Sequence, residues 1–393
     1  MVFGALKRKA FEQALTSPAV FKRLVRPFLY QLAGNDPEKV HELALEALVQ
    51  HEAVIEKHVG DFDFPKLHVD IAGQKRMPFG TAAGLDKNGD ALWPLSHIFG
   101  FEEPGTVVVQ DRKGNDRPRV AIDKRAQDVY NAQGFPSEGL SHFIHNVSDY
   151  RNRGGDAPLL VSVCGLPPQQ DKLHVAYSEL NTLVERIKVY ADGFVWNPFS
   201  PNTAALAALR TPEVFAKSAQ LMKEWTSEGT LLLVKMGPYE PDNDARKNWL
   251  ALAKAWMENG GDGIVAVNTY MTPKQFVPSK KWGYPSAGRS GRFLQNYRQR
   301  AVLDARQAFP DAFIIATGGI DSSEQAMQAF YAGANAIEGY TPYIFSGFGL
   351  VKEIAKGVEQ QLLSDGYETL AAFQKERFPV LDSNKNPDSC IVA

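Results

Sequence analysis

Cysteine is almost absent from this chain of 393 residues, in which only Cys164 and Cys390 occur. Two thiols so far apart in the sequence are too few for a disulfide framework, a cysteine-based zinc site or an iron–sulfur cluster. We therefore expect no metal site and a protein that works in a reducing compartment.

An excess of charge of one sign is also missing, because 43 lysine and arginine residues stand against 45 aspartate and glutamate residues. The formal net charge of −2 creates no global basic field, so binding to nucleic acid is not expected. A hydrophobic fraction of 44% with 22% charged residues is typical of a globular protein with a large core.

Long apolar runs are missing as well. The sequence contains no run of about 18 to 20 apolar residues, so no helix is expected to span a bilayer. The opening segment MVFGALKRKAFEQAL carries too much charge for the apolar core of a signal peptide. The last four residues, from Cys390 to Ala393, match the prenylation pattern, but no polybasic run precedes them, so we favour an unmodified tail over a lipidated one.

Residues 1–65 are instead predicted to form helices. Two start signals, Ser17-Pro18 and Asp36-Pro37, each place a capping residue before a first-turn proline. In the helix after Ser17 the apolar side chains share one stripe, the basic side chains face away, and a kink is expected near Pro27. The stripe holds Val20, Phe21, Leu24, Val25, Phe28, Leu29 and Leu32, and the basic residues are Lys22, Arg23 and Arg26.

The helix after Asp36 gathers its apolar side chains on one side, so it can pair with the first helix. These side chains are Val40, Leu43, Ala44, Ala47 and Leu48. The basic amphipathic segment either packs on the main domain or rests its apolar face on an anionic membrane, and the pattern leaves both interpretations open.

From about residue 77 the pattern changes to short apolar or β-branched runs, each followed by a helix-length stretch. The eight runs are Phe79–Ala82, Thr106–Val109, Leu159–Val163, Gly193–Trp196, Leu231–Val234, Gly263–Val267, Phe313–Ala316 and Ala336–Glu338. Strands that alternate with helices predict parallel pairing, and eight such units predict a closed (β/α)8 TIM barrel, an α/β fold. We assign the barrel to residues 66–365 and a C-terminal tail to residues 366–393.

Two intervals are longer than a plain strand–helix unit requires. Residues 111–136 are expected to form an excursion over the top of the barrel, and residues 270–291, rich in Pro, Lys, Gly and Ser, a long loop after strand six. Long loops at this end of a barrel are usually functional, so we expect the second to act as a lid over the active site.

Polar residues just after the apolar runs are the candidates for chemistry, because reacting groups in barrels lie where strands end. After the first run, Ala83 and Gly84 permit close backbone approach to a flat ligand and Lys87 offers a cation, although a plain turn explains these residues equally well. Lys235 follows four apolar residues, so its charge is predicted to point into the barrel mouth. A lysine buried there needs an anionic partner or a polarisable cofactor.

A phosphate site is indicated near strand seven. Gly318 and Gly319 precede a helix start, the arrangement in which backbone N–H groups hold a phosphate. Tyr340 and Thr341 follow strand eight, and phosphate sites in barrels are often built from the loops after strands seven and eight. The spacing therefore predicts a phosphorylated ligand.

Four asparagines, Asn131, Asn197, Asn202 and Asn268, fall at corresponding loop positions. Each amide offers donors and an acceptor, so four that converge would surround a planar ring with alternating C=O and N–H groups, such as a pyrimidine edge. Taken singly, each is better explained as a turn residue. Ser200 stands between two of them without a His-Asp pair or a Gly-x-Ser-x-Gly turn, which argues against acyl transfer.

Taken in order, these segments resemble those of the dihydroorotate dehydrogenases, and among them the class with a serine base and a membrane quinone as electron acceptor. The matching segments within residues 77–350 are AAGLDKNGDA, GTVV with GNDRPR, YNAQGF, SPNT, VK, VNT, SGR at 290–292, GGIDS and YTPYIFSG. The resemblance implies FMN as cofactor and a dihydropyrimidine as substrate. Ser200 would remove a proton from C5 of that substrate while C6 passes a hydride to N5 of the flavin.

The resemblance also implies roles for single residues. The substrate would be held by Lys87, Asn131, Phe135, Asn197, Asn202, Asn268 and Thr269, with Thr203 relaying the proton of Ser200. Lys235 would stabilise negative charge on the reduced flavin ring, and the full FMN set would be Ala83, Gly84, Thr106, Asn131, Asn197, Lys235, Asn268, Ser290, Gly291, Gly318, Gly319, Tyr340 and Thr341.

On the quinone side, the resemblance implies that the N-terminal helices form a hydrophobic tunnel, with His41 and Arg119 beside it. The protein would then be a peripheral membrane protein, on the cytoplasmic side of the inner membrane in a bacterium. The lack of cysteine clusters also disfavours the class that passes electrons to an iron–sulfur partner.

Three departures from the family pattern touch the predicted pocket. Residues 161–167 replace an asparagine and a Gly-Lys-Asn turn, Pro136 and Ser137 replace an asparagine pair, and residues 204–206 replace a Pro-Gly-Leu turn beside the base. Oxidation of dihydroorotate is the first hypothesis. A related flavoenzyme with another small substrate is the second, and a barrel without redox chemistry, a sugar-phosphate isomerase or a silent binding protein, is the third.

Overall fold

The computed structural model describes residues 2–200 and 203–378, with side chains from residue 8 onward. Its N-terminal region is helical, as predicted. The elements there are α1 Val2–Thr16, α2 Pro18–Val20, a π-helical turn η1 Phe21–Val25, α3 Arg26–Leu32, α4 Pro37–Gln50, α5 Glu52–Ile55 and the 3-10 turns η2 Glu56–Asp61 and η3 Pro65–Leu67.

Both predicted helix starts are confirmed by their caps. The Ser17 hydroxyl accepts the N–H of Val20 at 3.4 Å, and the Asp36 carboxylate accepts the N–H of Glu38 at 2.9 Å. The π-helical turn η1 ends at Val25, directly before α3, whose second residue Pro27 has no N–H to donate.

One expectation for the first amphipathic helix is wrong. Arg26 does not face away from the protein, because its guanidinium lies over the rings of Tyr30 and Phe345, 5.3 and 4.8 Å from their centroids. Arg26 and Tyr30, four residues apart, form the side through which α3 packs on the rest of the molecule. Part of the apolar stripe therefore faces solvent instead. Leu24, Phe28 and Leu32 are 66%, 58% and 56% exposed.

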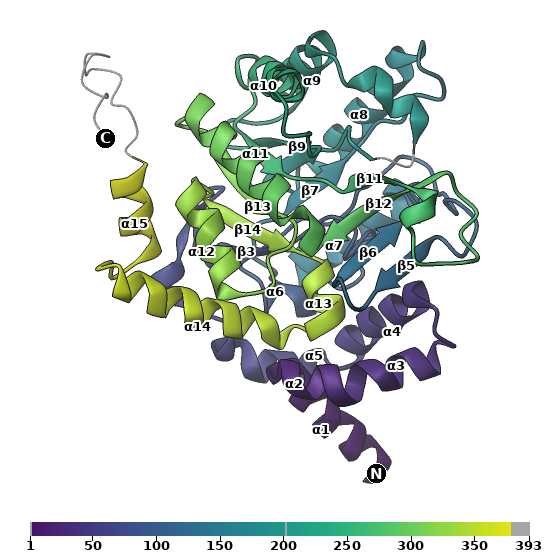
Figure 1. Ribbon diagram of the computed structural model, residues 1–393, viewed down its shortest axis with the longest axis vertical. Helices are drawn as coiled ribbons and strands as arrows, with labels where there is room; N and C mark the ends of the chain where they lie inside the picture. The colour runs from purple at the N-terminus through teal and green to yellow at the C-terminus, as the bar shows by residue number, and fades with distance from the viewer. Residues whose placement is uncertain (1, 201–202, 379–393) are drawn as a thin grey trace.

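Eight parallel strands form the central sheet, and the sheet closes on itself (Figure 1). The strands are β3 Phe79–Thr81, β4 Phe101–Glu102, β7 Leu160–Val163, β8 Gly193–Trp196, β9 Leu231–Met236, β10 Gly263–Ala266, β13 Phe313–Thr317 and β14 Ala336–Gly339. Their hydrogen-bonded order is β4-β3-β14-β13-β10-β9-β8-β7, and parallel bridges between the Glu102 and Leu159 pair and the Val107 and Val163 pair join the two ends. The predicted (β/α)8 barrel is confirmed.

The second strand is displaced from its predicted place. It lies at Phe101–Glu102, and of the run Thr106–Val109 only Val107 keeps a parallel bridge. Pro104 has no N–H for a ladder, and Gly105 has a positive φ of 115°, so the chain turns between the two segments. Apolar content alone does not reveal this break.

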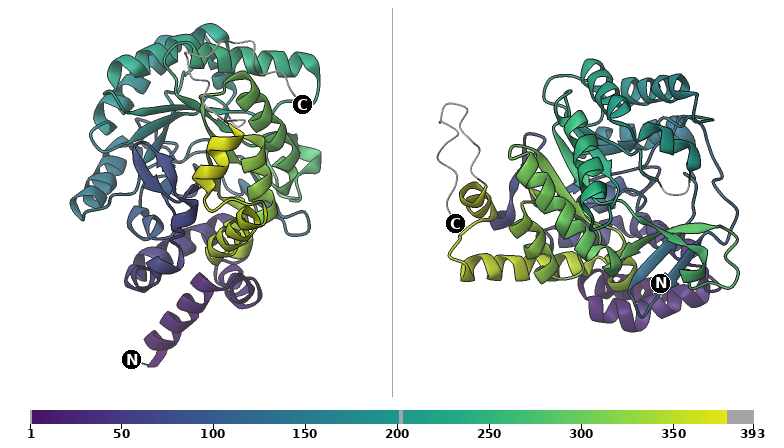
Figure 2. Two further views of the ribbon diagram at one scale, coloured as in Figure 1. Left: turned by 90° about the vertical axis from the view of Figure 1, so that its left-hand side faces the viewer. Right: turned by 45° about the horizontal axis from the view of Figure 1, so that its top comes forward.

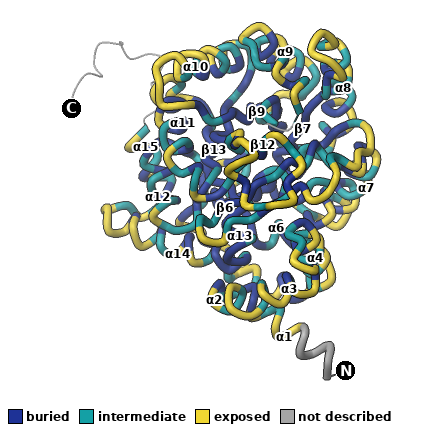
Figure 3. The backbone as a smooth tube through the Cα atoms, turned by 45° about the vertical axis from the view of Figure 1, so that its right-hand side comes forward, coloured by how far each residue is buried: buried dark blue, intermediate teal, exposed yellow. Residues whose placement is uncertain are grey.

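Helices surround the strands on the outside of the barrel (Figure 2). They are α6 Leu92–Ser96, α7 Gly139–Asn152, α8 Leu173–Ile187, α9 Pro212–Trp225, α10 Asn243–Met257, α11 Gln295–Ala308, α12 Ser323–Ala332, α13 Thr341–Ser346, α14 Gly349–Ser364 and α15 Leu370–Arg377. Short 3-10 turns are η4 Ala204–Leu209, η5 Lys274–Phe276 and η6 Arg292–Leu294, and the hairpin β1 Val69–Ile71 with β2 Gln74–Arg76 precedes the barrel. Figure 3 shows exposed residues along the outer helices and buried residues along the strands.

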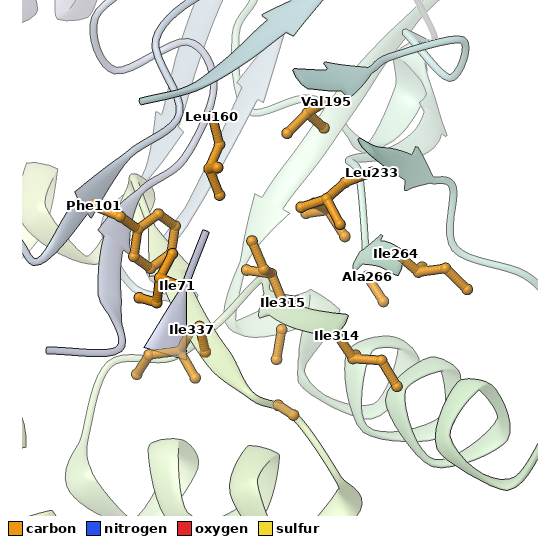
Figure 4. Packing of buried hydrophobic residues seen from close by; sticks show 14 of the residues in the cluster. Ile71, Phe101, Leu160, Val195, Leu233, Ile264, Ala266, Ile314, Ile315 and Ile337 are labelled. Atoms are coloured by element: carbon orange, nitrogen blue, oxygen red, sulfur yellow. The ribbon is translucent and has the colours of Figure 1, made fainter. Parts of the chain in front are cut away.

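The core fills the inside of the barrel and the layer between strands and helices. Phe101, Leu233 and Ile315 lie in the enclosed space, whereas Ile264 and Ile314 point toward the helices (Figure 4). Successive side chains of a strand alternate between the two faces, so both faces of these strands are apolar.

A second sheet covers one end of the barrel. Its strands are β5 Val120–Asp123, β6 Asp128–Asn131, β11 Tyr270–Pro273 and β12 Ser286–Gly291, paired antiparallel in the order β11-β12-β6-β5. The excursion at residues 111–136 and the segment at 270–291 thus form one structure, although the second was predicted to be a loop. Their own small apolar cluster consists of Ala121, Tyr130, Ala132, Val277, Trp282 and Ala287.

Candidate active site

A cavity lies between the carboxyl ends of the barrel strands and the second sheet. Its wall contains residues from β5, β6 and β12 on one side and residues at or just after seven of the eight barrel strands on the other. The predicted site residues within it are Ala83, Gly84, Lys87, Thr106, Asn131, Phe135, Asn197, Ser200, Lys235, Asn268, Thr269, Ser290, Gly291, Gly318, Gly319, Tyr340 and Thr341. Asn202 lies outside the described residues.

Lys235 is placed in the cavity by the alternation of its strand. Phe101 and Leu233 point into the barrel, and Glu103 and Lys235 stand two positions further along the same segments. The Lys235 ammonium donates to Glu103 at 2.6 Å and to Glu338 at 2.9 Å. Burial alone would lower the pKa of Lys235, but the two carboxylates outweigh it and raise that pKa to about 12.

Glu338 is strongly affected by its surroundings. Burial and the repulsion of Glu103 raise the pKa of Glu338 well above its ordinary range, while Lys235 opposes this rise. Glu103 also accepts the N–H of Ala83 at 3.2 Å. This bond connects the cluster of Lys235, Glu103 and Glu338 to the loop after β3. Sequence reasoning placed Lys235 but missed both acids. The available signal was a charged residue inside an apolar run, as in Ala336–Glu338.

Two of the predicted asparagines meet directly. Asn268 donates to the side-chain oxygen of Asn197 at 2.9 Å, and Asn197 donates to the Thr106 hydroxyl at 2.8 Å. The Thr106 hydroxyl also lies 3.0 Å from that of Ser162, and the N–H of Thr269 donates to Asn268 at 2.7 Å. These bonds hold the amide planes of Asn197 and Asn268 in fixed orientations at the cavity wall.

Asn131 reaches the cavity from the second sheet. It is the last residue of β6 and pairs with Gly288 of β12, whose carbonyl accepts its side-chain amide at 3.1 Å. Ser200 follows β8, and its backbone carbonyl accepts from Arg210 at 3.1 Å. The cavity thus places a serine from the barrel and an asparagine from the cover in one space.

The glycine pair after β13 forms an open turn. Gly318 and Gly319 have φ values of 107° and 70°, which β-carbon-bearing residues rarely adopt. An added Cβ on Gly319 would lie 2.6 Å from Gln295 and 2.8 Å from the Gly291 carbonyl, so glycine is required there. Helix α12 begins just beyond, with Ser322 accepting the N–H of Gln325 at 3.2 Å. Backbone amides and a helix start together suit a phosphate.

A second cleft lies beside the first, and Lys87 lines both. His41 of α4 packs edge-on against Tyr340, with ring centroids 5.4 Å apart, and burial followed by repulsion from Lys87 lowers the pKa of His41 to about 3. Arg119 donates to both carboxylate oxygens of Glu38 at 3.1 Å. The two predicted quinone-side residues therefore line this second cleft, with His41 next to the first.

The model of the dihydroorotate dehydrogenase family matches residues 66–362. The chain belongs to this family. A dihydroorotate dehydrogenase (quinone) of Psychrobacter cryohalolentis is 31% identical over 351 residues, covering 85% of this chain and 96% of that protein. One of Vibrio parahaemolyticus is 29% identical over 352 residues, covering 86% and 99%.

Solved structures of the family have the same fold. A crystal structure of the Eimeria tenella dihydroorotate dehydrogenase in complex with ferulenol has a TM-score of 0.73 and 25% identity, covering 86% of this chain and 94% of that chain. The ligand-free form from the same organism has a TM-score of 0.71 and 25% identity, covering 82% and 96%.

The departures from the family pattern differ in their relation to the cavity. Pro136 lines it, and Ser137 lines the second cleft. Cys164 is buried and lines neither, and the strand-three segment reaches the site through the Ser162 hydroxyl that contacts Thr106. Of these changes, the one at residue 136 therefore alters the wall of this dihydroorotate dehydrogenase cavity directly.

Proposed function

We propose that this protein oxidises dihydroorotate to orotate in pyrimidine biosynthesis, with FMN as its cofactor and a membrane quinone as electron acceptor. The observation that carries the proposal is a single cavity that holds a serine, a set of amides, a buried lysine and a glycine-rich helix start together. Membership of the family supports the activity, since the curated relatives are named dihydroorotate dehydrogenase (quinone).

The residues of the cavity fit a flavin mononucleotide. In the described part of the chain, the N–H groups of Gly318 and Gly319 have no acceptor, so they are available to a phosphate. Thr341, whose hydroxyl lies 2.8 Å from that of Ser290, lines the same cavity and would also bind the phosphate. Lys235 is charged and held in place for the polar edge of the ring. When bound, the flavin would supply a hydride acceptor.

The residues of the chain would bind and deprotonate the substrate. Asn131, Asn197 and Asn268 would orient the ring through donors and acceptors that are already fixed, which reduces the entropy lost on binding. Lys87 would attract the carboxylate. Ser200 would take the proton from C5, and the cover sheet would keep bulk water from the reacting face.

We also propose that η1 and α3 rest on a membrane surface. Exposed Leu24 of η1 lies four and eight residues before exposed Phe28 and Leu32 of α3, so the three form one continuous apolar stripe. The exposed Lys22 and Arg23 of η1 lie beside it. Within the described residues no helix has the length and apolarity needed to cross a membrane. The second cleft, which is lined by α4, is the proposed approach for the quinone.

Anaerobic spectroscopy tests the activity. The yellow protein is mixed with dihydroorotate, and the flavin absorbance is expected to bleach and then to return when a quinone is added. Dihydrouracil, which lacks the carboxylate, serves as the control and should bleach the flavin far more slowly. A flavin-loaded, folded sample that dihydroorotate fails to bleach would reject the proposal in favour of another small substrate.

A further inference from the structure

A fully buried arginine with no acidic partner stands behind the glycine turn of the cavity. Arg298 of α11 is 0% exposed. It donates to the Gly318 carbonyl at 2.9 Å and to the side-chain oxygen of Gln325 at 2.8 Å, both neutral acceptors. Its Nε is buried without any partner, and no carboxylate within the described residues forms an ion pair with it.

The acid whose charge acts on Arg298 is already paired elsewhere. Asp321 lies 2.5 Å from Arg292, and it acts on Arg298 only through its field. Burial lowers the pKa of Arg298 to about 10, so the guanidinium still carries its charge at neutral pH. A charge held in the interior without an opposite charge is unfavourable, so an anion bound near Arg298 would compensate it.

The hydrogen bonds of Arg298 link it to the elements that suit a phosphate. Arg298 and Gln295, both on α11, donate to the carbonyls of Gly318 and Gly319 at 2.9 Å each. Because side chains of α11 bind the two glycine carbonyls, the N–H groups of the two glycines remain available to a ligand in the cavity. Gln325, the other acceptor, lies in the first turn of α12, whose N-terminus adds to the same positive potential.

We propose that Arg298 sets the affinity for the cofactor phosphate, by supplying a buried positive charge behind Gly318 and by fixing the carbonyl of that residue. It is a positioning and charge-compensating residue that need not touch the phosphate. The inference rests on the proposed function for the identity of the phosphorylated ligand, and it assigns a role to a residue that no motif had indicated.

The same helix provides a matched control. Arg306, eight positions further along α11, is also buried, and burial lowers its pKa to about 10 as well. It donates to the Gly333 carbonyl at 2.9 and 2.8 Å and to Asn335 at 2.6 Å, again neutral acceptors. Unlike Arg298, it has no bond to a residue that lines the cavity.

The test compares FMN with riboflavin, which lacks the phosphate. Full-length protein freed of flavin is titrated with each, and quenching of flavin fluorescence gives the dissociation constants. Arg298→Gln is expected to weaken FMN binding about 30-fold and riboflavin binding less than about threefold, since only FMN carries the charge. Arg298→Lys, which keeps the charge, should recover most of the loss, and Arg306→Gln should change neither constant beyond about threefold.

A second measurement uses inorganic phosphate and needs no flavin. Phosphate is expected to raise the melting temperature of the flavin-free wild type and of Arg306→Gln but not of Arg298→Gln. A wild type that responds to phosphate yet binds neither flavin would reject the proposed function and leave the assignment of Arg298 in place.

Three results would overturn the assignment. Arg298→Gln could bind FMN as tightly as the wild type, or lose affinity for FMN and riboflavin equally, which would indicate a purely structural role. Flavin-free Arg298→Gln could also melt far below Arg306→Gln, which would contradict an uncompensated charge at residue 298.

Discussion

Glu102 and Glu103 are neighbours in the chain with opposite surroundings, because successive side chains of an extended segment point to opposite faces. Glu103 faces into the barrel and meets Lys235 at 2.6 Å. Glu102 is fully buried on the other face, and neither of its oxygens has a hydrogen-bond partner among the residues that the structure describes. At the scale of the residue, a buried carboxylate is tolerated when an opposite charge contacts it and destabilises the fold when none does.

The free energy of unfolding should depend on pH through Glu102. Burial, then repulsion from Asp86, raises the pKa of Glu102 well above its ordinary value of 4.5, while Arg151 opposes the rise. The native state therefore retains a proton that the unfolded state releases, and stability is lost as pH rises above about 4.5 toward the folded pKa.

Glu102→Gln removes this dependence. We expect the variant to be more stable than the wild type by about 1–3 kcal/mol at pH 8, with the difference vanishing near pH 4. Urea denaturation at both values of pH measures it. Asp86, whose pKa burial raises to about 6, remains in both proteins. A difference independent of pH would contradict the assignment.

Ser200→Ala should abolish fast flavin reduction while flavin stays bound. The serine is the only proposed acceptor for the C5 proton, so the anaerobic bleaching rate should fall about 100-fold or more. Ser178→Ala, at an exposed position on α8, is the control and should keep the wild-type rate. Bleaching of Ser200→Ala at the rate of the control would show that another group takes the proton.

At the scale of the element, α3 illustrates how packing reorients a pattern that is visible in the sequence. The apolar stripe that runs through η1 and α3 is wide enough that one edge, with Val25 and Leu29, is half-buried while the other edge stays in solvent. Arg26 joins the buried side because its guanidinium stacks on aromatic rings, which costs less than burying a compact ammonium.

The exposed apolar edge of η1 and α3 is expected to matter only when lipid is present. The double change Leu24→Ser and Phe28→Ser should weaken binding to anionic vesicles about tenfold or more, since two large apolar side chains no longer insert. Reduction of a soluble dye by dihydroorotate should be unchanged. Val189→Ser, at an equally exposed apolar residue just after α8, should leave vesicle binding intact. Unchanged vesicle binding by the double variant would remove α3 from the membrane contact.

At the scale of the whole molecule, buried ion pairs connect the N-terminal helices to the cover of the barrel. The carboxylate of Glu38 on α4 forms an ion pair with Arg119 of the 111–136 excursion at 2.7 Å. It forms a second ion pair with Arg117 at 3.2 Å. Arg119 in turn donates to the Lys113 and Asn115 carbonyls. These contacts therefore hold α4 against the excursion, and both segments line the second cleft.

Breaking this connection should destabilise the fold. Arg119→Gln leaves the buried Glu38 with only the half-exposed Arg117 as an ion-pair partner among the described residues, so the free energy of unfolding is expected to fall by about 2 kcal/mol in chemical denaturation. Lys254→Gln, which breaks an exposed ion pair between Lys254 of α10 and Glu258 just after that helix, should leave the free energy of unfolding unchanged within error. A loss no larger than that of Lys254→Gln would mean that the pair contributes nothing to the docking of α4.

The sequence by itself determined the barrel and most of its site. The alternation of apolar runs with helical stretches is a local signal, and parallel strands place their carboxyl ends at one rim, so the residues after each run could be named in advance. Ser200, Lys235, Asn268 and the glycine pair after β13 were found in this way. The displaced second strand shows the limit of the signal where a proline and a glycine interrupt a run.

Tertiary structure alone decided the rest. β6 and β12 pair although about 160 residues separate them, and Lys235 finds its acids more than 100 positions away on either side. The role proposed for Arg298 depends on its hydrogen bond to the Gly318 carbonyl, which only the folded chain provides. Propensity and periodicity describe neighbours along the chain, whereas the partner of a buried charge and the pairing of two long loops depend on groups that meet only after the barrel has closed.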